Sequence, residues 1–193
     1  MHGLINRSLQ SFLRDTYGRD LWASVAEKAG VGPEGFEAMF SYDDALTDMV
    51  LVAATDILAK PRDALLEDLG MFLVSLEPLR RLLRFGGVNY VDFLHSLDEL
   101  PDRARLAVTD IGLPELELSA NGFTAFALHV GAGHSGFAPV FAGILRAMAD
   151  DYGAFALVDL ADQASEPGVI RIELLETQFA TGRAFDLARP EAM

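Results

Sequence analysis

The sequence predicts an α+β protein with a helical first part and a last part that forms a four-stranded antiparallel sheet with packed helices. Over roughly the first hundred residues, apolar positions recur with the period of about 3.6 residues that is typical of amphipathic helices. After Pro114 the pattern changes to short alternating runs bounded by turn residues, which indicates strands. We expect one domain over residues 1–193, with a helical subdomain at 1–60 and an α+β subdomain at 61–193.

The first predicted helix begins near Leu4 and carries Leu9, Phe12 and Leu13 on one face before it ends at Gly18. Further helical patterns cover residues 21–29, 45–59, 62–76 and 88–100. At a turn of about 100° per residue, position 101 falls on the apolar stripe of the last of these helices. We therefore predict that the side chain of Pro101 points into the core, and that His95, on the opposite side, is solvated.

The candidate strands are ELELSA, FTAFALHV, AFALVDLA and GVIRIELLE, at residues 115–120, 123–130, 154–161 and 168–176. Between the second and the third, residues 137–153 carry one more helical stripe of apolar side chains. The segment ADQASEPG at 161–168 is predicted to connect the last two strands as a hairpin. The tail from Gly182 onward is expected to fray.

Composition excludes several classes of function. The formal charge of −14 would repel phosphate backbones and anionic membrane surfaces, so we expect neither nucleic acid nor membrane as a partner. The absence of cysteine rules out disulfides, thiolate metal sites and a cysteine nucleophile. The N-terminus lacks the pattern of a signal peptide, and no apolar run reaches membrane-spanning length, which predicts a cytoplasmic protein.

The stretch HVGAGHSGFAP, residues 129–139, concentrates histidine and glycine. It lacks the lysine and the glycine spacing of a phosphate-binding loop. His129 and His134 have no obvious third ligand nearby in the sequence, so a metal site is not predicted. Because no nucleophile elbow, carboxylate pair or metalloprotease helix is present, we expect no enzyme. A hydrolase or metal enzyme that uses these two histidines is the least supported alternative.

The order of several short motifs resembles one family. These motifs are GLIN at 3–6, Gly18, Trp22, YDD at 42–44, LVAA at 51–54, LLEDLG at 65–70, FLHSLDEL at 93–100, LPEL at 113–116 and GFAPVFAGIL at 136–145. Together they resemble the haem nitric oxide/oxygen-binding (H-NOX) domains. The resemblance implies a helical and an α+β subdomain with haem b between them. It also implies a sensor role toward a signalling protein, such as a histidine kinase or a cyclic-dinucleotide enzyme.

The chain departs from this family at the positions that handle haem. By resemblance, Pro101 stands where the family has its axial histidine, and proline has no donor atom for iron. Val130, Ala132 and His134 stand where the family has a Tyr-x-Ser-x-Arg motif that holds the haem propionates. The resemblance places an apolar pocket at Ile5, Leu9, Leu73, Pro139 and Ile144.

These departures lead to two functional hypotheses. The first is a stand-alone sensor or regulatory domain of this family in which the family's haem ligation is lost. The alternative is a haem-free protein-interaction module, or a binder of another apolar ligand in the same cleft. An open cleft between the subdomains would favour a ligand, whereas bulky side chains in that space would favour the interaction module.

Overall fold

The computed structural model describes residues 1–161 and 168–176, and it confirms the predicted α+β class. The helices before the sheet are α1 (Gly3–Tyr17), α2 (Arg19–Ala29), α3 (Asp44–Leu58), α4 (Arg62–Ser75), α5 (Glu77–Arg84), α6 (Tyr90–His95), the short 3-10 helix η1 (Leu97–Glu99) and α7 (Leu100–Ala107). The remaining elements are β1 (Leu116–Asn121), β2 (Ala125–Val130), α8 (Phe137–Tyr152), β3 (Phe155–Leu160) and β4 (Val169–Glu176).

One predicted helix needs correction, and one helix was not predicted. The single helix expected at 88–100 is divided into α6 and η1, and a new helix, α7, follows from Leu100. Pro101 lies in the first turn of α7, where its missing N–H costs no helical hydrogen bond, whereas inside a continuous helix it would break one. Helix α5 was not predicted, because it is short and rich in arginine.

The four strands form one sheet in the order β1-β2-β4-β3, and every neighbouring pair is antiparallel. Helix α8 connects β2 to β3, which lie on either side of β4 and therefore run parallel to each other. Alternate residues of the two central strands, such as Leu128 and Ile170, are fully buried. The pairing of β3 with β4 agrees with the predicted hairpin, but its connection and the tail lie outside the described residues.

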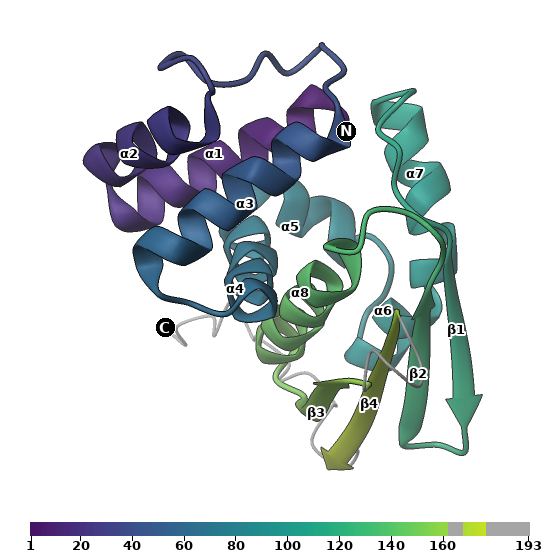
Figure 1. Cartoon of the computed structure of the whole chain (residues 1–193). Helices are drawn as coiled ribbons and strands as arrows, with labels where there is room; N and C mark the ends of the chain where they lie inside the picture. Colours follow the sequence, from purple (N-terminus) through teal and green to yellow (C-terminus); the bar gives the residue numbers. More distant parts are fainter. Residues whose placement is uncertain (162–167, 177–193) are drawn as a thin grey trace, which may run out of the picture.

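Buried apolar side chains form two clusters. One is built from α1 to α4 and the loop before α3, and its last buried member along the chain is Leu69. The other extends from Val74 through the sheet and α8, and Val140 of α8 packs against both. Figure 1 shows α1, α2 and α3 on one side of the α4 and α8 pair, and the sheet on the other. Helix α4 contributes to both clusters, so the clusters do not separate at residue 60. The subdomain boundary expected there stays a prediction.

Helices α4 and α8 cross with their backbones in close contact. A Cβ added to Gly143 would lie 1.9 Å from the carbonyl oxygen of Glu67, and one added to Gly70 would lie 2.1 Å from that of Val140. Only glycine allows this approach from both sides. Arg146 of α8 pairs with the carboxylate of Glu67 and donates to the Val158 carbonyl oxygen on β3. The two halves of the molecule, one around each apolar cluster, are therefore joined directly where α4 crosses α8.

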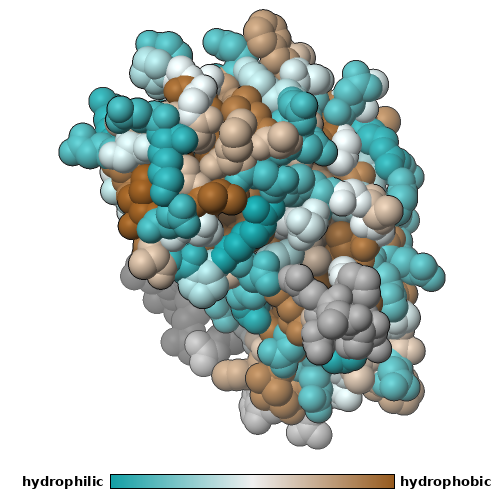
Figure 2. Space-filling view, viewed as in Figure 1, coloured by the Kyte–Doolittle hydropathy of each residue, from teal (hydrophilic) through white to brown (hydrophobic). Residues whose placement is uncertain are grey.

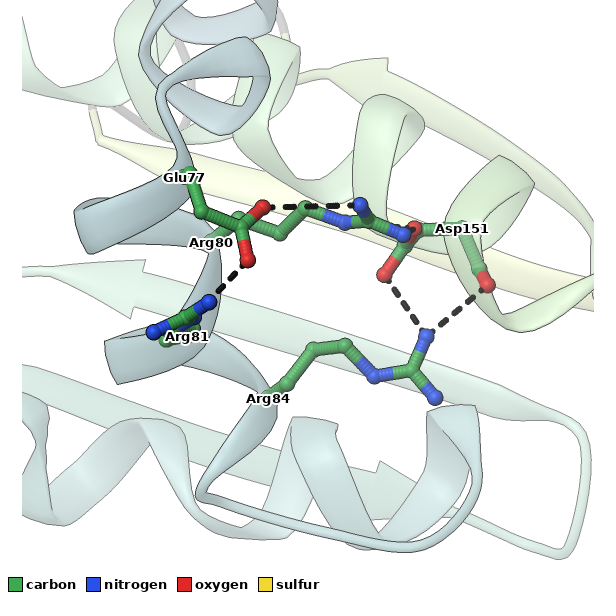
Figure 3. A network of polar contacts seen from close by, with 5 residues as sticks. All are labelled: Glu77, Arg80, Arg81, Arg84 and Asp151. Atoms are coloured by element: carbon green, nitrogen blue, oxygen red, sulfur yellow. Dashed lines mark hydrogen bonds and ion pairs between the residues drawn. The ribbon is translucent and has the colours of Figure 1, made fainter.

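A second polar connection attaches α5 to the end of α8 (Figure 3). Arg80 and Arg84 both donate to the carboxylate of Asp151, with an Arg80 Nε to Oδ1 distance of 2.8 Å. Arg84 also lies over the ring of Tyr152, 4.4 Å from its centroid. Burial by itself would raise the pKa of Asp151, but the hydrogen bonds and charges of the two arginines outweigh it and lower the pKa below its usual value.

On the face shown in Figure 2, apolar residues lie in small groups interleaved with hydrophilic residues. Phe85, Val88, Leu106 and Phe123 are among the most exposed apolar side chains. Within the described ranges, no helix combines the length and the apolar character needed to cross a membrane.

Candidate functional site

A small pocket of about 40 Å³ lies where the N-terminal helices meet the loop before α8. Its walls come from α1, α3 and α4 on one side and from residues 134–140 on the other. They are lined by Met1, Ile5, Asn6, Leu9, Thr47, Leu51, Leu66, Leu69, His134, Gly136, Phe137 and Val140. The pocket therefore spans both halves of the chain, but it is far smaller than the ~300–1,000 Å³ of pockets that hold drug-sized ligands.

Asn6 is the most unusual residue of this pocket. It lies on the inner side of α1 with no exposed surface, although asparagine is a poor helix former. The hydroxyl of Thr47 on α3 donates to its Oδ1 at 2.8 Å, and no described residue accepts from its Nδ2. Sequence reasoning missed both residues. The available signal was a polar side chain at the edge of the apolar stripe formed by Ile5, Leu9 and Leu13.

Gln10, one turn further along α1, shows how a buried amide is normally satisfied. Its Nε2 donates to the carbonyl oxygen of Glu34, and its Oε1 accepts from the N–H of Phe36 at 3.0 Å. Both ends of this amide thus hold the loop before α3 in place. Asn6 has no such second partner, so its role differs from that of Gln10.

His134 links the two sides of the pocket. Its Nδ1 accepts from the N–H of Gly136, and its Nε2 lies 3.1 Å from Oδ1 of Asp48 on α3. Asp48 also pairs with Arg62 of α4 at 2.5 Å. The hydrogen bond from Arg62, opposed by partial burial, lowers the pKa of the Asp48 carboxyl below its usual value. The turn before α8 is therefore fastened to the N-terminal helices by a polar contact.

The other predicted haem-motif positions offer no polar side-chain group. Pro101 is buried in the first turn of α7, as the helical period predicted. Val130 is half-buried at the end of β2, and Ala132 is exposed in the following turn. These three side chains contain no atom that can ligate iron or donate a hydrogen bond to a carboxylate.

The side chains of His95, His129 and His134 lie in separate parts of the molecule. His95 is exposed, as predicted, and its ring contacts the edge of Phe126. His129 is exposed on β2 and lies 3.2 Å from the hydroxyl of Ser119, while His134 faces Asp48. The structure thus does not bring His129 and His134 to one point. No group of three or more potential metal ligands occurs in the part of the chain that the structure describes.

Of the apolar pocket residues predicted by resemblance, Ile5 and Leu9 line the observed pocket. Leu73 on α4 packs against the N-terminal cluster, and Ile144 on α8 is buried in the C-terminal one. Pro139 is buried in the first turn of α8. Leu73, Pro139 and Ile144 do not border the pocket.

The fold is that of solved H-NOX domains. An H-NOX mutant from K. algicida superposes with a TM-score of 0.77 at 13% identity, covering 93% of this chain and 99% of that one. The I5F mutant of T. tengcongensis H-NOX superposes with a TM-score of 0.76 at 17% identity, covering 93% of this chain and 100% of that one. These likenesses define the class of protein by its fold.

The sequence itself matches the Haem-NO-binding family over residues 2–156, and the chain belongs to this family. Its members are sensor domains of the type that binds haem and nitric oxide or oxygen. Among curated proteins, the chain is similar to "Soluble guanylate cyclase gcy-31" of Caenorhabditis elegans, with 24% identity over 167 residues. The match covers 84% of this chain and 24% of that protein, so the chain corresponds to about a quarter of its relative's length.

Proposed function

We propose that this chain is a regulatory sensor domain of the H-NOX family that works without the family's axial haem ligation. Membership in the family supports the sensor role. The observation that carries the haem-free part is Pro101, which is buried in the first turn of α7 at the position matched to the axial histidine. Proline has no donor atom, and no rotation of its side chain can supply one.

The walls of the pocket support the same conclusion. The volume of about 40 Å³ leaves no space for a porphyrin. Haem propionates need cationic or hydroxyl donors, and Val130 and Ala132 provide neither. His134 is already engaged with Asp48 and Gly136. The residues at this seam, where the N-terminal helices meet residues 134–140, do not fit a haem.

A sensor must bind something that prefers one of its states, or it must pass on the state of a partner protein. The packed seam also favours the second candidate function, a haem-free interaction module. In both cases the partner class we infer is a signalling enzyme, such as a histidine kinase or a cyclic-dinucleotide enzyme. The acidic charge of −14 favours a protein partner with a basic surface.

The test is an absorption spectrum of the chain expressed with haem supplied, before and after nitric oxide is added under reducing conditions. We expect no stoichiometric Soret band. A sharp band that shifts with nitric oxide would overturn the proposal. Single alanine variants of His2, His95, His129 and His134 would then locate the ligand. A myoglobin sample carried through the same preparation controls for haem loading.

The partner class is tested separately by measuring the autophosphorylation of a histidine kinase, or the product formed by a cyclic-dinucleotide enzyme, with and without the purified chain. A concentration-dependent change that saturates would support the regulatory role. Unchanged rates with candidate enzymes of both kinds would remove this partner class.

A further inference from the structure

A second, larger groove of about 590 Å³ lies on the outer side of the N-terminal helices. Its walls are one face of α2, the second half of α1 and the loop that follows α2. Figure 1 shows α2 on the side of the molecule away from the sheet. The groove shares no lining residue with the small pocket at the seam, and its volume lies in the range of ~300–1,000 Å³ that is typical of pockets for small ligands.

The middle of this groove is apolar, and it is recessed because α2 carries small side chains there. Ala23 and Ala26, three residues apart on one face of the helix, leave a depression that larger side chains would fill. Trp22, which is almost fully buried, contributes an edge of its ring, and Val31 and Pro33 close the groove from the loop. An apolar group of a ligand would leave water here without displacing a contact within the protein.

The two ends of the groove carry opposite charges. Arg14 and Arg19 lie where α1 passes into α2. Glu27, in the last turn of α2, and Glu34, in the loop after it, lie at the other end. Arg14 is paired with Asp15, whereas the side chains of Arg19, Glu27 and Glu34 form no ion pair or hydrogen bond with any residue that the structure describes. A ligand can therefore be paired at both ends without breaking an existing contact.

The spacing of these charges sets the length of the ligand. Eight residues separate Arg19 from Glu27, which places their Cα atoms about 12 Å apart along α2. An extended peptide of three residues spans about 10 Å between its ammonium and its carboxylate. The flexible side chains of arginine and glutamate cover the difference. Because both charged side chains are exposed, the two ends of such a peptide would stay partly hydrated when bound.

We propose that this groove binds a short apolar peptide with free ends. Its carboxylate pairs with Arg19, its ammonium pairs with Glu27, and its central side chain lies in the depression at Ala23 and Ala26. This inference goes beyond the proposed function, because the groove lies outside the seam and its ligand does not depend on the presence or absence of haem.

The test titrates the tripeptide Ala-Leu-Ala into the purified chain at low ionic strength and follows the indole N–H signal of Trp22 by ¹H–¹⁵N NMR. The chain has a single tryptophan, and it lines the groove. We expect saturable binding in about the millimolar range for so small a ligand. Blocking either end of the tripeptide, as the N-acetyl or the C-terminal amide form, should weaken binding roughly 2- to 5-fold, because exposed ion pairs contribute little each. A salt concentration of about 1 M should remove this difference.

Two charge variants assign the two ends. Arg19→Gln should bind the free tripeptide and its C-terminal amide equally, while it keeps the preference for a free ammonium. Glu27→Gln should lose the preference for the ammonium and keep the one for the carboxylate. Arg7→Gln is the matched control, because Arg7 is exposed on α1 and does not line the groove, and it should keep both preferences.

A third variant tests the depression. Ala23→Leu fills it with a residue that favours a helix, and Ala23 is exposed, so the fold is retained. We expect this variant to lose saturable binding of the free and the blocked tripeptides alike. Circular dichroism and the melting temperature confirm that the variant is folded.

Three results would overturn the inference. The response of Trp22 could rise linearly without saturation, the wild type could bind the free and the doubly blocked tripeptide equally, or Ala23→Leu could bind like the wild type. None of these results involves haem or the seam. They are therefore distinguishable from a failure of the proposed function, which would appear as a Soret band.

Discussion

The Nε2 of His134 lies 3.1 Å from Oδ1 of Asp48, and these residues are 86 positions apart in the sequence. Because the N–H of Gly136 donates to Nδ1, the hydrogen on His134 is assigned to Nε2, where it is donated to the carboxylate. This contact connects the turn before α8 with α3, beside the pocket. By resemblance to the family, position 134 would carry the arginine of the motif that holds the haem propionates.

The first prediction concerns this contact. His134→Ala should reduce the free energy of unfolding by about 0.5–1.5 kcal/mol, because both hydrogen bonds of the ring are lost. It should also speed amide hydrogen exchange in the turn before α8. His129→Ala is the control, because that side chain is exposed, and it should change stability by less than about 0.5 kcal/mol. Equal effects of the two variants would contradict a structural role for His134.

The second prediction concerns the helix crossing. Gly143→Ala should destabilise the chain by about 1–3 kcal/mol, because the new Cβ meets the backbone of Glu67 and the helices must move apart. This cost exceeds the gain of about 1 kcal/mol that alanine normally brings to a helix. Gly32→Ala is the matched control, because a Cβ there meets nothing within 4 Å. Urea unfolding measures both variants, and a stabilised Gly143→Ala protein would show that the helices are not in close contact.

The third prediction is a dependence on pH. Asp151 has a pKa below its usual value in the folded state, so it stabilises the fold fully above the unfolded pKa of about 3.9. This stabilisation is lost as the pH falls through the lower, folded pKa. Asp151→Asn should therefore cost about 1–3 kcal/mol at neutral pH and progressively less below about pH 4. Unfolding curves for the wild type, Asp151→Asn and the exposed control Asp150→Asn measure this, and a pH-independent difference would contradict it.

The fourth prediction tests whether the missing axial ligand would by itself account for the proposed absence of haem. Pro101→His should still give no stoichiometric Soret band, because the seam between the halves remains packed around a pocket of about 40 Å³. Pro101→Ala controls for the effect of the substitution on folding, which circular dichroism follows in both variants. A Soret band in Pro101→His and not in Pro101→Ala would show that the seam opens readily and that only the axial ligand was lost.

Much of the fold follows from local patterns. The 3.6-residue period predicted α1, α3, α4 and α8, and period-two alternation predicted the four strands. The same period placed Pro101 on the buried side and His95 on the exposed side, and both positions are confirmed. The helical period could not show that the helix is interrupted before Pro101, because projecting residues at a constant angle assumes a continuous helix.

The candidate site was less accessible to such reasoning. Ile5 and Leu9 were expected at a pocket and line one, whereas Leu73, Pro139 and Ile144 do not border it. Asn6 and Thr47 were missed, because a single polar residue at the edge of an apolar stripe does not reveal whether it will find a partner. That depends on α3, whose residues lie some forty positions away.

The sequence by itself determined the class of the fold, the family and the absence of a donor atom at position 101, because these depend on residue types and their local order. Tertiary structure decided the rest. The close crossing of α4 and α8 at Gly70 and Gly143 and the pairing of His134 with Asp48 both follow from how the helices pack against one another. Both depend on distances between segments far apart in the chain, and these distances are set by packing rather than by any local period.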